Sequence, residues 1–177
     1  PHPPTHNPEL NKKTRKAHGI IASKTGSEDF LSHINWIQFV KLAKRVGCFM
    51  WGRKTYDAVI KWEGDYLKDL EDVKKIIISG SKIDLREGFE LAHSPEEAME
   101  ILERNGFKEA IITGGATINS EFAKRGLIDE VIFDINPSIL GEGLPVFQVE
   151  DFELKLELVE VEKLTDGIVE LRYKVKK

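Results

Sequence analysis

The chain has 177 residues, of which 41% are hydrophobic, and its 26 basic and 30 acidic side chains give a formal net charge of −4. This length is enough for one globular domain whose core needs neither disulfides nor a structural metal. The charges are interspersed along the chain, which argues against a nucleic-acid-binding face, so we expect a small molecule as the binding partner.

Membrane insertion and cysteine or metal chemistry are not expected. The longest apolar runs are far shorter than the roughly 20 residues of a membrane span, and the N-terminus carries no apolar signal segment, so we expect a cytoplasmic protein. The single cysteine, Cys48, lies in the apolar run VGCFMW, which indicates a buried, inert thiol. His2, His6 and His18 show no compact ligand spacing, and we expect no metal site.

An extended arm precedes a single predicted domain. Residues 1–18 hold four of the seven prolines and a basic cluster, which is typical of an extended segment, and residues 19–177 form the domain. Strands and helices alternate in its first part. The predicted strands are 19–23, 46–51, 74–79, 109–115 and 129–137, and the predicted helices are 34–45, 54–62, 94–106 and 116–126.

Two local signals are strong. Ser94 and Glu97 form a capping box with Pro95 at the first helical position, and Gly106 ends that helix. Near the C-terminus, residues 151–164 and 167–177 alternate with period two around Thr165-Asp166-Gly167, which predicts a hairpin. The apolar phase flips after Leu158, which indicates a β-bulge.

Together these elements predict a three-layer α/β fold. Strands that alternate with helices favour a mainly parallel central sheet with helices on both faces. The C-terminal antiparallel hairpin completes it.

Three strand-to-helix junctions combine glycine with hydroxyl or basic side chains. Parallel sheets bind ligands at the carboxyl ends of their strands, where glycine lets backbone N–H groups approach a phosphate and a helix N-terminus favours an anion. A tight turn and a solvated basic pair are the ordinary alternatives. The loops match neither the P-loop nor the G-x-G-x-x-G pattern. The junctions are Gly52-Arg53-Lys54-Thr55, Gly80-Ser81-Lys82 directly after Ser79, and Gly114-Gly115-Ala116-Thr117.

Two of these segments carry a family resemblance. MWGRKTYDAV and ITGGATINSEFAKRGLIDEVIFDINPSILGEGLPVF resemble the dihydrofolate reductase-like superfamily, and most closely the reductase domain of riboflavin biosynthesis. The resemblance runs from Gly19 to the final hairpin and implies bound NADPH. It implies that the adenosine phosphate lies near Arg53, Ser79 and Ser81, the pyrophosphate on Lys54, Thr55 and Gly115 to Ile118, and the nicotinamide near Ile21 and Ala22. From residue type alone, Ser79, Ser81 and Lys82 could surround the phosphate that distinguishes NADPH from NADH.

The substrate side departs from the family pattern. Dihydrofolate reductases carry an acid where this chain has Asn35 or its neighbour Trp36, and an amide cannot carry a negative charge. Riboflavin-type reductases show Ser-x-Asp-Gly where this chain has Ser23-Lys24-Thr25-Gly26, and Glu where it has Thr113.

The candidate substrate residues come from these stretches. Ser23, Asn35, Trp36 and Thr113 are the expected substrate wall, with proton delivery by water or by Asp29. Trp36 is equally compatible with a helix core, and Asp29 with a solvated acidic loop.

The sequence therefore predicts an NADPH-dependent reductase that transfers hydride to a pterin, a pyrimidine or a related substrate. The alternative is a non-catalytic nucleotide-binding or regulatory protein on the same fold, which the amide at Asn35 motivates. A third hypothesis is that the chain is the reductase part of a bifunctional enzyme. The resemblance also implies a homodimer formed through the sheets, for which the terminal strands are candidates.

Overall fold

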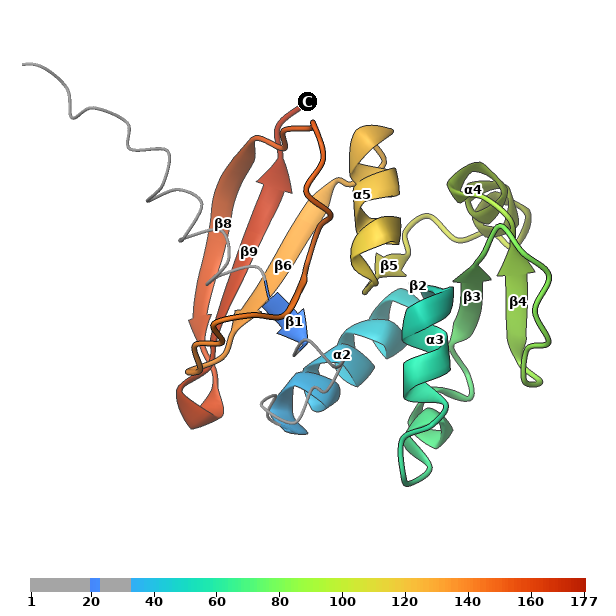
Figure 1. Ribbon diagram of the computed structural model, residues 1–177, viewed down its shortest axis with the longest axis horizontal. Helices are drawn as coiled ribbons and strands as arrows, with labels where there is room; N and C mark the ends of the chain where they lie inside the picture. The colour runs from blue at the N-terminus through green and yellow to red at the C-terminus, as the bar shows by residue number, and fades with distance from the viewer. Residues whose placement is uncertain (1–19, 23–32) are drawn as a thin grey trace, which may run out of the picture.

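The computed structural model describes residues 20–22 and 33–177, with side chains from residue 33 onward (Figure 1). The predicted arm, Ser23 and Asp29 lie outside the described residues. The strands are β1 (Ile20–Ala22), β2 (Cys48–Gly52), β3 (Lys74–Ile78), β4 (Phe89–Ala92), β5 (Ile111–Ile112), β6 (Glu130–Ile135), β7 (Leu144–Pro145), β8 (Leu156–Lys163) and β9 (Val169–Val175). The helices are α2 (His33–Val46), α3 (Arg53–Val59), α4 (Pro95–Arg104) and α5 (Ala116–Lys124), with short 3-10 helices η1 (Tyr66–Leu70) and η2 (Thr165–Gly167).

A four-stranded parallel sheet in the order β4-β3-β2-β5 forms the centre of the fold. Every residue of β2 is buried, as a strand covered on both faces requires. Cys48, Met50 and Ile76 pack toward α4 and α5, whereas Phe49, Trp51 and Ile77 pack toward α2 and α3. Helices therefore cover both faces, which confirms the predicted three-layer α/β arrangement.

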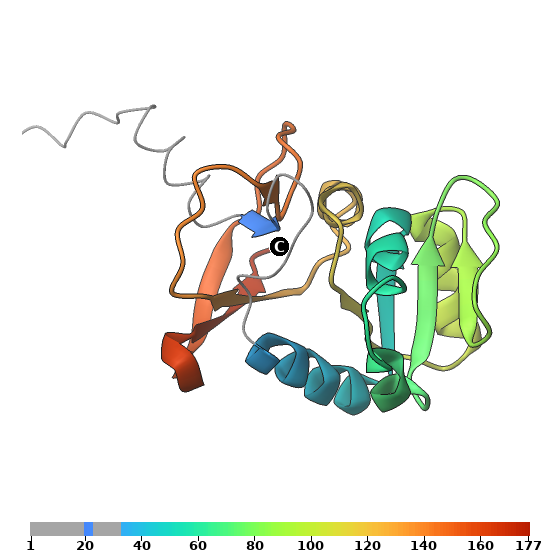
Figure 2. The ribbon, with the colours of Figure 1, turned by 60° about the horizontal axis from the view of Figure 1, so that its bottom comes forward.

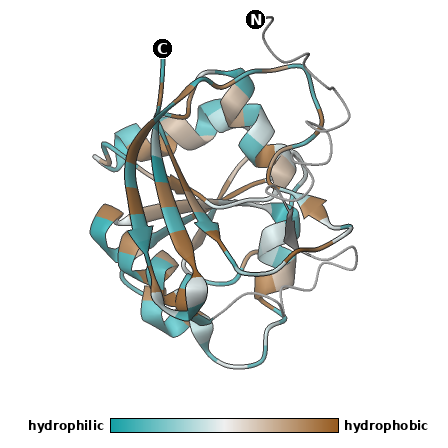
Figure 3. Cartoon of the chain, turned by 90° about the vertical axis from the view of Figure 1, so that its left-hand side faces the viewer, coloured by the Kyte–Doolittle hydropathy of each residue, from teal (hydrophilic) through white to brown (hydrophobic). Residues whose placement is uncertain are grey.

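The C-terminal strands form a separate antiparallel sheet in the order β6-β9-β8 (Figure 2). The register shifts between Leu158 and Glu160, which confirms the predicted bulge, and Asp166 and Gly167 turn the hairpin with φ of 57° and 74°. The sequence predicted β6 as a strand, and the structure pairs it antiparallel with β9. Hydrophilic and hydrophobic residues alternate along these strands (Figure 3).

Three strands differ from the sequence expectation. β4 and β7 were not predicted, and β1 pairs antiparallel with β7 and does not join the parallel sheet. Strand identity depends on partners that are distant along the chain, and short runs such as FELA carry little local signal.

Local capping follows the sequence closely. The Ser94 hydroxyl accepts a hydrogen bond from the Glu97 N–H at 3.1 Å, with Pro95 in the first turn. The Glu97 carboxylate accepts from the His93 N–H at 2.6 Å, one residue before the usual partner in a capping box. Gly106 follows the helix with φ of 74°. The start of α4 is therefore set by a few neighbouring residues.

Candidate functional site

The strand order creates a topological switch point at the carboxyl ends of β2 and β5. The chain runs outward from β2 to β3 and β4, and then returns to place β5 on the other side of β2. The helices that follow these two strands lie on opposite faces of the sheet, since Tyr56 of α3 and Phe122 of α5 belong to different core clusters. Open α/β sheets bind ligands in the crevice that such a reversal leaves.

Glycine lines this crevice because the backbones approach closely. The Gly52 N–H donates to the Gly114 carbonyl at 2.7 Å. A Cβ on Gly52 would lie 2.8 Å from Cγ1 of Ile118 and 3.4 Å from the Gly115 nitrogen. Gly114 has φ of 131° and is joined to Gly115 by a cis peptide bond. Side chains larger than hydrogen are therefore excluded where the two strands turn into helices.

The N-termini of α3 and α5 meet at the same place without side-chain caps. Gly52 is the N-cap residue of α3 and Gly115 that of α5, and neither helix start has a side-chain cap. The first N–H groups of a helix lack intrahelical partners and carry the positive end of its dipole. Both helix starts therefore present backbone N–H groups without side-chain caps at this switch point.

The side chains of the first and third predicted junctions surround this crevice. The Thr55 hydroxyl lies 3.4 and 3.5 Å from the positions that Cβ atoms would take on Gly114 and Gly115. Arg53 and Lys54 are exposed, and Arg53 Nε lies 3.5 Å from a carboxylate oxygen of Asp57. Ala116, Thr117 and Ile118 form the first turn of α5. The Thr117 hydroxyl accepts a hydrogen bond from Gln148 Nε2 at 3.3 Å.

The second junction lies on the next strand along the sheet. Ile78 pairs with Gly52, so Ser79 follows β3 directly beside the start of α3. The buried Ser79 hydroxyl accepts from the Ser81 N–H at 3.3 Å, and Ser81 and Lys82 are exposed. All three predicted junctions therefore lie at the carboxyl ends of adjacent strands, namely β3, β2 and β5.

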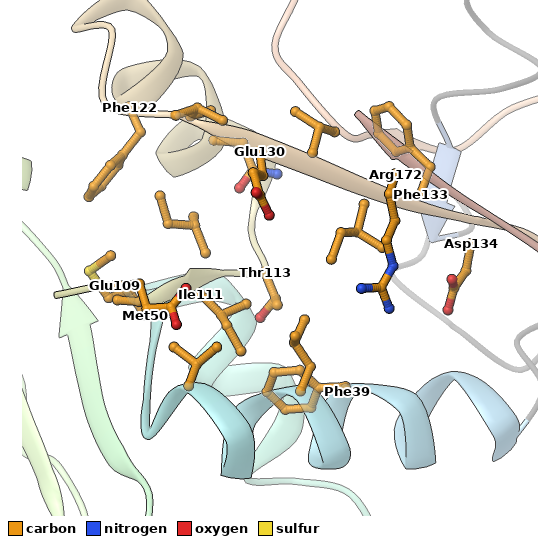
Figure 4. A pocket seen from close by; sticks show the side chains of 18 of the residues that line it. Phe39, Met50, Glu109, Ile111, Thr113, Phe122, Glu130, Phe133, Asp134 and Arg172 are labelled. Carbon is orange, nitrogen blue, oxygen red and sulfur yellow. The ribbon is translucent and has the colours of Figure 1, made fainter. Parts of the chain in front are cut away.

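A cavity of about 1620 Å³ runs along β5, between α2, α4, α5, β6 and β9 (Figure 4). Its apolar wall includes Phe39, Met50, Ile111 and Phe122. Asn35, Asp134, Glu170 and Arg172 also line it. The cavity thus combines an apolar surface with a small polar group, as small-molecule sites do.

The polar group centres on the Asp134 carboxylate. Asn35 Nδ2 donates to Asp134 Oδ2 at 3.0 Å. Asp134 pairs with Glu170 of the neighbouring strand β9. The Glu170 side chain is 5% exposed, and its carboxylate accepts a hydrogen bond from Arg172 Nε at 2.7 Å. Burial raises the pKa of Asp134 above its ordinary value, the Asn35 hydrogen bond opposes this, and the nearby Glu170 adds to it.

The residues predicted for the substrate wall fall in different places. Asn35 and Thr113 line the cavity, and the Thr113 hydroxyl accepts from Trp51 Nε1 at 2.5 Å. The Trp36 ring instead packs against Phe39, Trp62 and Tyr66, with ring centroids 5.4, 5.7 and 5.5 Å away. This is the helix-core arrangement. Ile21 and Ala22 belong to β1, and their side chains lie outside the described part of the structure.

Sequence reasoning missed Asp134, Glu170 and Arg172. A usable signal was present, because aspartate is depleted in strands and Asp134 interrupts the apolar run VIFDI. Its pairing with Asn35 carried no local signal, since the two residues are 99 positions apart.

A family model of the RibD C-terminal domain matches residues 54–170. The chain belongs to this family. The relative YyaP of Bacillus subtilis (strain 168), an uncharacterized protein, is 25% identical over 169 residues, which is 88% of each chain. The RibD C-terminal domain match begins within α3 and includes the paired glycines and β6, whereas Gly52 and Arg53 lie just before it.

Solved structures share the fold. A candidate riboflavin biosynthesis protein from Shewanella sp. PV-4 superposes with a TM-score of 0.74 at 24% identity, covering 90% of this chain and 94% of that one. A pyrimidine reductase-like protein from Corynebacterium diphtheriae superposes with a TM-score of 0.69 at 14% identity, covering 90% and 88%. These likenesses show a common fold for the RibD C-terminal domain and these two proteins.

The described residues contain neither a membrane-spanning helix nor a group of metal ligands. No described helix combines the length and hydropathy that crossing a membrane requires. Within residues 33–177, no three or more His, Cys, Asp or Glu side chains are grouped so that they could hold a metal ion.

Proposed function

We propose that this protein is an NADPH-dependent reductase that transfers hydride to a pyrimidine or a related nitrogen heterocycle such as a pterin. The observation that carries the proposal is the switch-point crevice, where two uncapped helix N-termini meet over glycine. Membership of the RibD C-terminal domain family and the fold shared with a pyrimidine reductase-like protein support the reaction class.

The residues present fit a dinucleotide. Adjacent strands lie about 4.8 Å apart, so the junctions of β3, β2 and β5 span roughly 10 Å, which suits several phosphates in a row. The absent Cβ at Gly52 lets Ile118 and the Gly115 nitrogen pack directly against the end of β2, which brings the starts of α3 and α5 together. Lys54, Thr55 and residues 115–118 would hold the pyrophosphate. Arg53, Ser79, Ser81 and Lys82 would hold the additional phosphate of NADPH.

When bound, NADPH supplies the hydride. The chain's own contribution is to position the acceptor ring and to exclude water from it. Phe39, Ile111 and Phe133 provide apolar surface in the cavity, and Thr113, directly after β5 and directly before Gly114, lines the same cavity (Figure 4). We expect the substrate ring to occupy this cavity and its hydride-accepting face to be turned toward the crevice.

Titration with NADPH, followed by nicotinamide fluorescence, tests the cofactor site. Loss of charge-assisted hydrogen bonds in Arg53→Ala/Lys54→Ala should weaken NADPH binding by about 10- to 100-fold. Lys163→Ala removes an exposed charge on β8 and should leave the affinity unchanged. Equal NADPH affinity in the double variant and the wild type would refute the assignment.

Turnover separates the reductase from a non-catalytic nucleotide-binding protein. Loss of nicotinamide absorbance on addition of dihydrofolate or of a phosphoribosylaminopyrimidine is the expected result. Tight NADPH binding without oxidation by any pterin or pyrimidine would instead favour the non-catalytic alternative.

A further inference from the structure

Resting on the proposed function, we infer that Asp134, positioned by Asn35, is the carboxylate that binds the substrate, and that its ligand is a nitrogen heterocycle with adjacent N–H donors. Such a ligand carries an amino group beside a ring N–H. The inference supplies the acid that the sequence pattern lacks at Asn35, from a different element of the fold.

The first observation is a set of buried acceptors that lack donors. Asp134 Oδ1, Asn35 Oδ1 and Asn136 Oδ1 are all buried and have no hydrogen-bond partner among the described residues. Buried polar atoms in native proteins are nearly always paired, so each such atom calls for an explanation. All three are oxygen atoms that accept hydrogen bonds. The missing partner is therefore a group that donates several hydrogen bonds.

The second observation is that these atoms share one location. Asp134 and Asn136 are two positions apart on β6 and the residue after it, so their side chains leave the same face of the strand. Asn35 lies in the first turn of α2, and all three residues line the cavity. Asp134 projects from β6 toward α2 (Figure 4). Asn35 occupies Asp134 Oδ2, and no described donor reaches Oδ1, while the neighbouring Glu170 carboxyl raises the Asp134 pKa both by its charge and by hydrogen bonding.

The third observation is the sign of the local charge. The charged groups that act on Asp134 among the described residues are Glu170 and Arg172 of β9. Arg172 Nε lies 2.7 Å from a Glu170 oxygen and 3.7 Å from a Glu160 oxygen, so its positive charge is already paired with two other carboxylates. Such surroundings repel an anion and favour a neutral or cationic N–H donor.

Burial of this carboxylate agrees with a binding role. The raised pKa of Asp134 reflects a cost of keeping its charge in the folded protein without a full set of donors. A ligand with two N–H groups would remove that cost by pairing with the carboxylate. The phosphates of the cofactor belong to the crevice at Gly52 and Gly115, where helix N-termini supply the opposite polarity.

The competing explanation is that Asp134 and Asn35 only fasten α2 to β6. The variant Asp134→Asn separates the two, because its amide oxygen still accepts from Asn35 Nδ2 while the negative charge is lost. The probes are 2,4-diaminopyrimidine, which presents an amino group beside a ring N–H once a ring nitrogen is protonated, and 2,4-dimethoxypyrimidine, which has no amino group. Calorimetry measures both against NADPH-saturated protein, and unfolding measurements confirm that the variant is folded.

The wild type should prefer the diamino probe by at least about tenfold, and Asp134→Asn should lose that preference while its NADPH affinity stays unchanged. The exchange Asn35→Asp/Asp134→Asn, which returns a carboxylate to the pair, should recover part of it. Glu157→Gln, a change of the same charge at an exposed position on β8, should have no effect.

The failures are distinguishable. An unchanged preference in Asp134→Asn, or no preference in the wild type, overturns this inference and leaves the cofactor site standing. Failure of the wild type to bind NADPH overturns the proposed reductase, and the probes are then compared on the protein alone. A preference that still depends on Asp134 in that case would support the binding role outside a reductase.

Discussion

Replacing Gly52 with alanine tests the close approach on which the crevice depends. The new Cβ would lie 2.8 Å from Cγ1 of Ile118, about 0.6 Å inside the 3.4 Å at which ordinary contact begins. Ile118 is β-branched and lies in α5, where one χ1 rotamer is strongly preferred, so Cγ1 cannot rotate away without cost. The Gly115 nitrogen, at 3.4 Å, limits movement on the other side. Relief requires α5 to move away from β2.

The magnitude follows from two opposing terms. Overpacking of this kind costs about 1–3 kcal/mol. Gly52 has φ of −74° and ψ of 162°, which alanine adopts without strain, so reduced freedom of the unfolded chain returns about 0.4–1 kcal/mol. We expect a net loss of about 1–2 kcal/mol. For a chain of this size, that lowers the melting temperature by about 2–8 °C.

Thermal unfolding followed by circular dichroism measures this loss, and NADPH titration measures the accompanying loss of affinity. Gly141→Ala is the matched control, because a Cβ there meets nothing within 4 Å. Ile118→Ala removes Cγ1, so Gly52→Ala should cost less in that background, whereas Ile118→Val keeps a γ carbon and should give no relief. A wild-type melting temperature in Gly52→Ala, or an equal cost in both backgrounds, would refute the reasoning.

Three further predictions concern stability and reactivity. The raised pKa of Asp134 means that the folded state binds this proton more tightly than the unfolded chain, so its contribution to stability falls as pH rises from the unfolded to the folded pKa. Asp134→Asn should flatten that part of the pH–stability curve and leave the protein at least as stable at neutral pH, and a steeper fall would contradict the sign. Ser94→Ala removes the α4 cap and should lower the free energy of unfolding in urea by about 0.5–2 kcal/mol, whereas an unchanged midpoint would show that the cap contributes nothing. Burial raises the pKa of Cys48 to about 12, so the native thiol should resist disulfide reagents that modify it after unfolding, and rapid native modification would contradict its burial.

The features that the sequence predicted well depend on residues close together in the chain. The cap at Ser94 involves neighbours three positions away, and the turn at Asp166 and the bulge after Leu158 follow from local alternation. The glycine junctions were also visible as local patterns at strand ends. The short strand β4 was missed because its four residues become a strand only by pairing with β3.

The candidate site shows the same division more sharply. Glycine pairs and basic residues at three strand ends predicted an anion site, but only the strand order shows that β3, β2 and β5 are neighbours. Trp36 could belong to the core or to a substrate wall by helical spacing alone, and its contacts with Trp62 and Tyr66 place it among aromatic rings.

The sequence by itself determined the class of fold, the local turns and caps, and the residue types able to receive phosphate, because periodicity and glycine placement act over a few residues. Only the tertiary structure decided which of those residues share a site. The carboxylate expected near Asn35 is absent from the helix, and Asp134 lies against that amide from a strand 99 positions later. Residues that are far apart in the sequence become neighbours when the sheet and the helix pack. No local pattern around Asn35 could therefore indicate that Asp134 lies beside it.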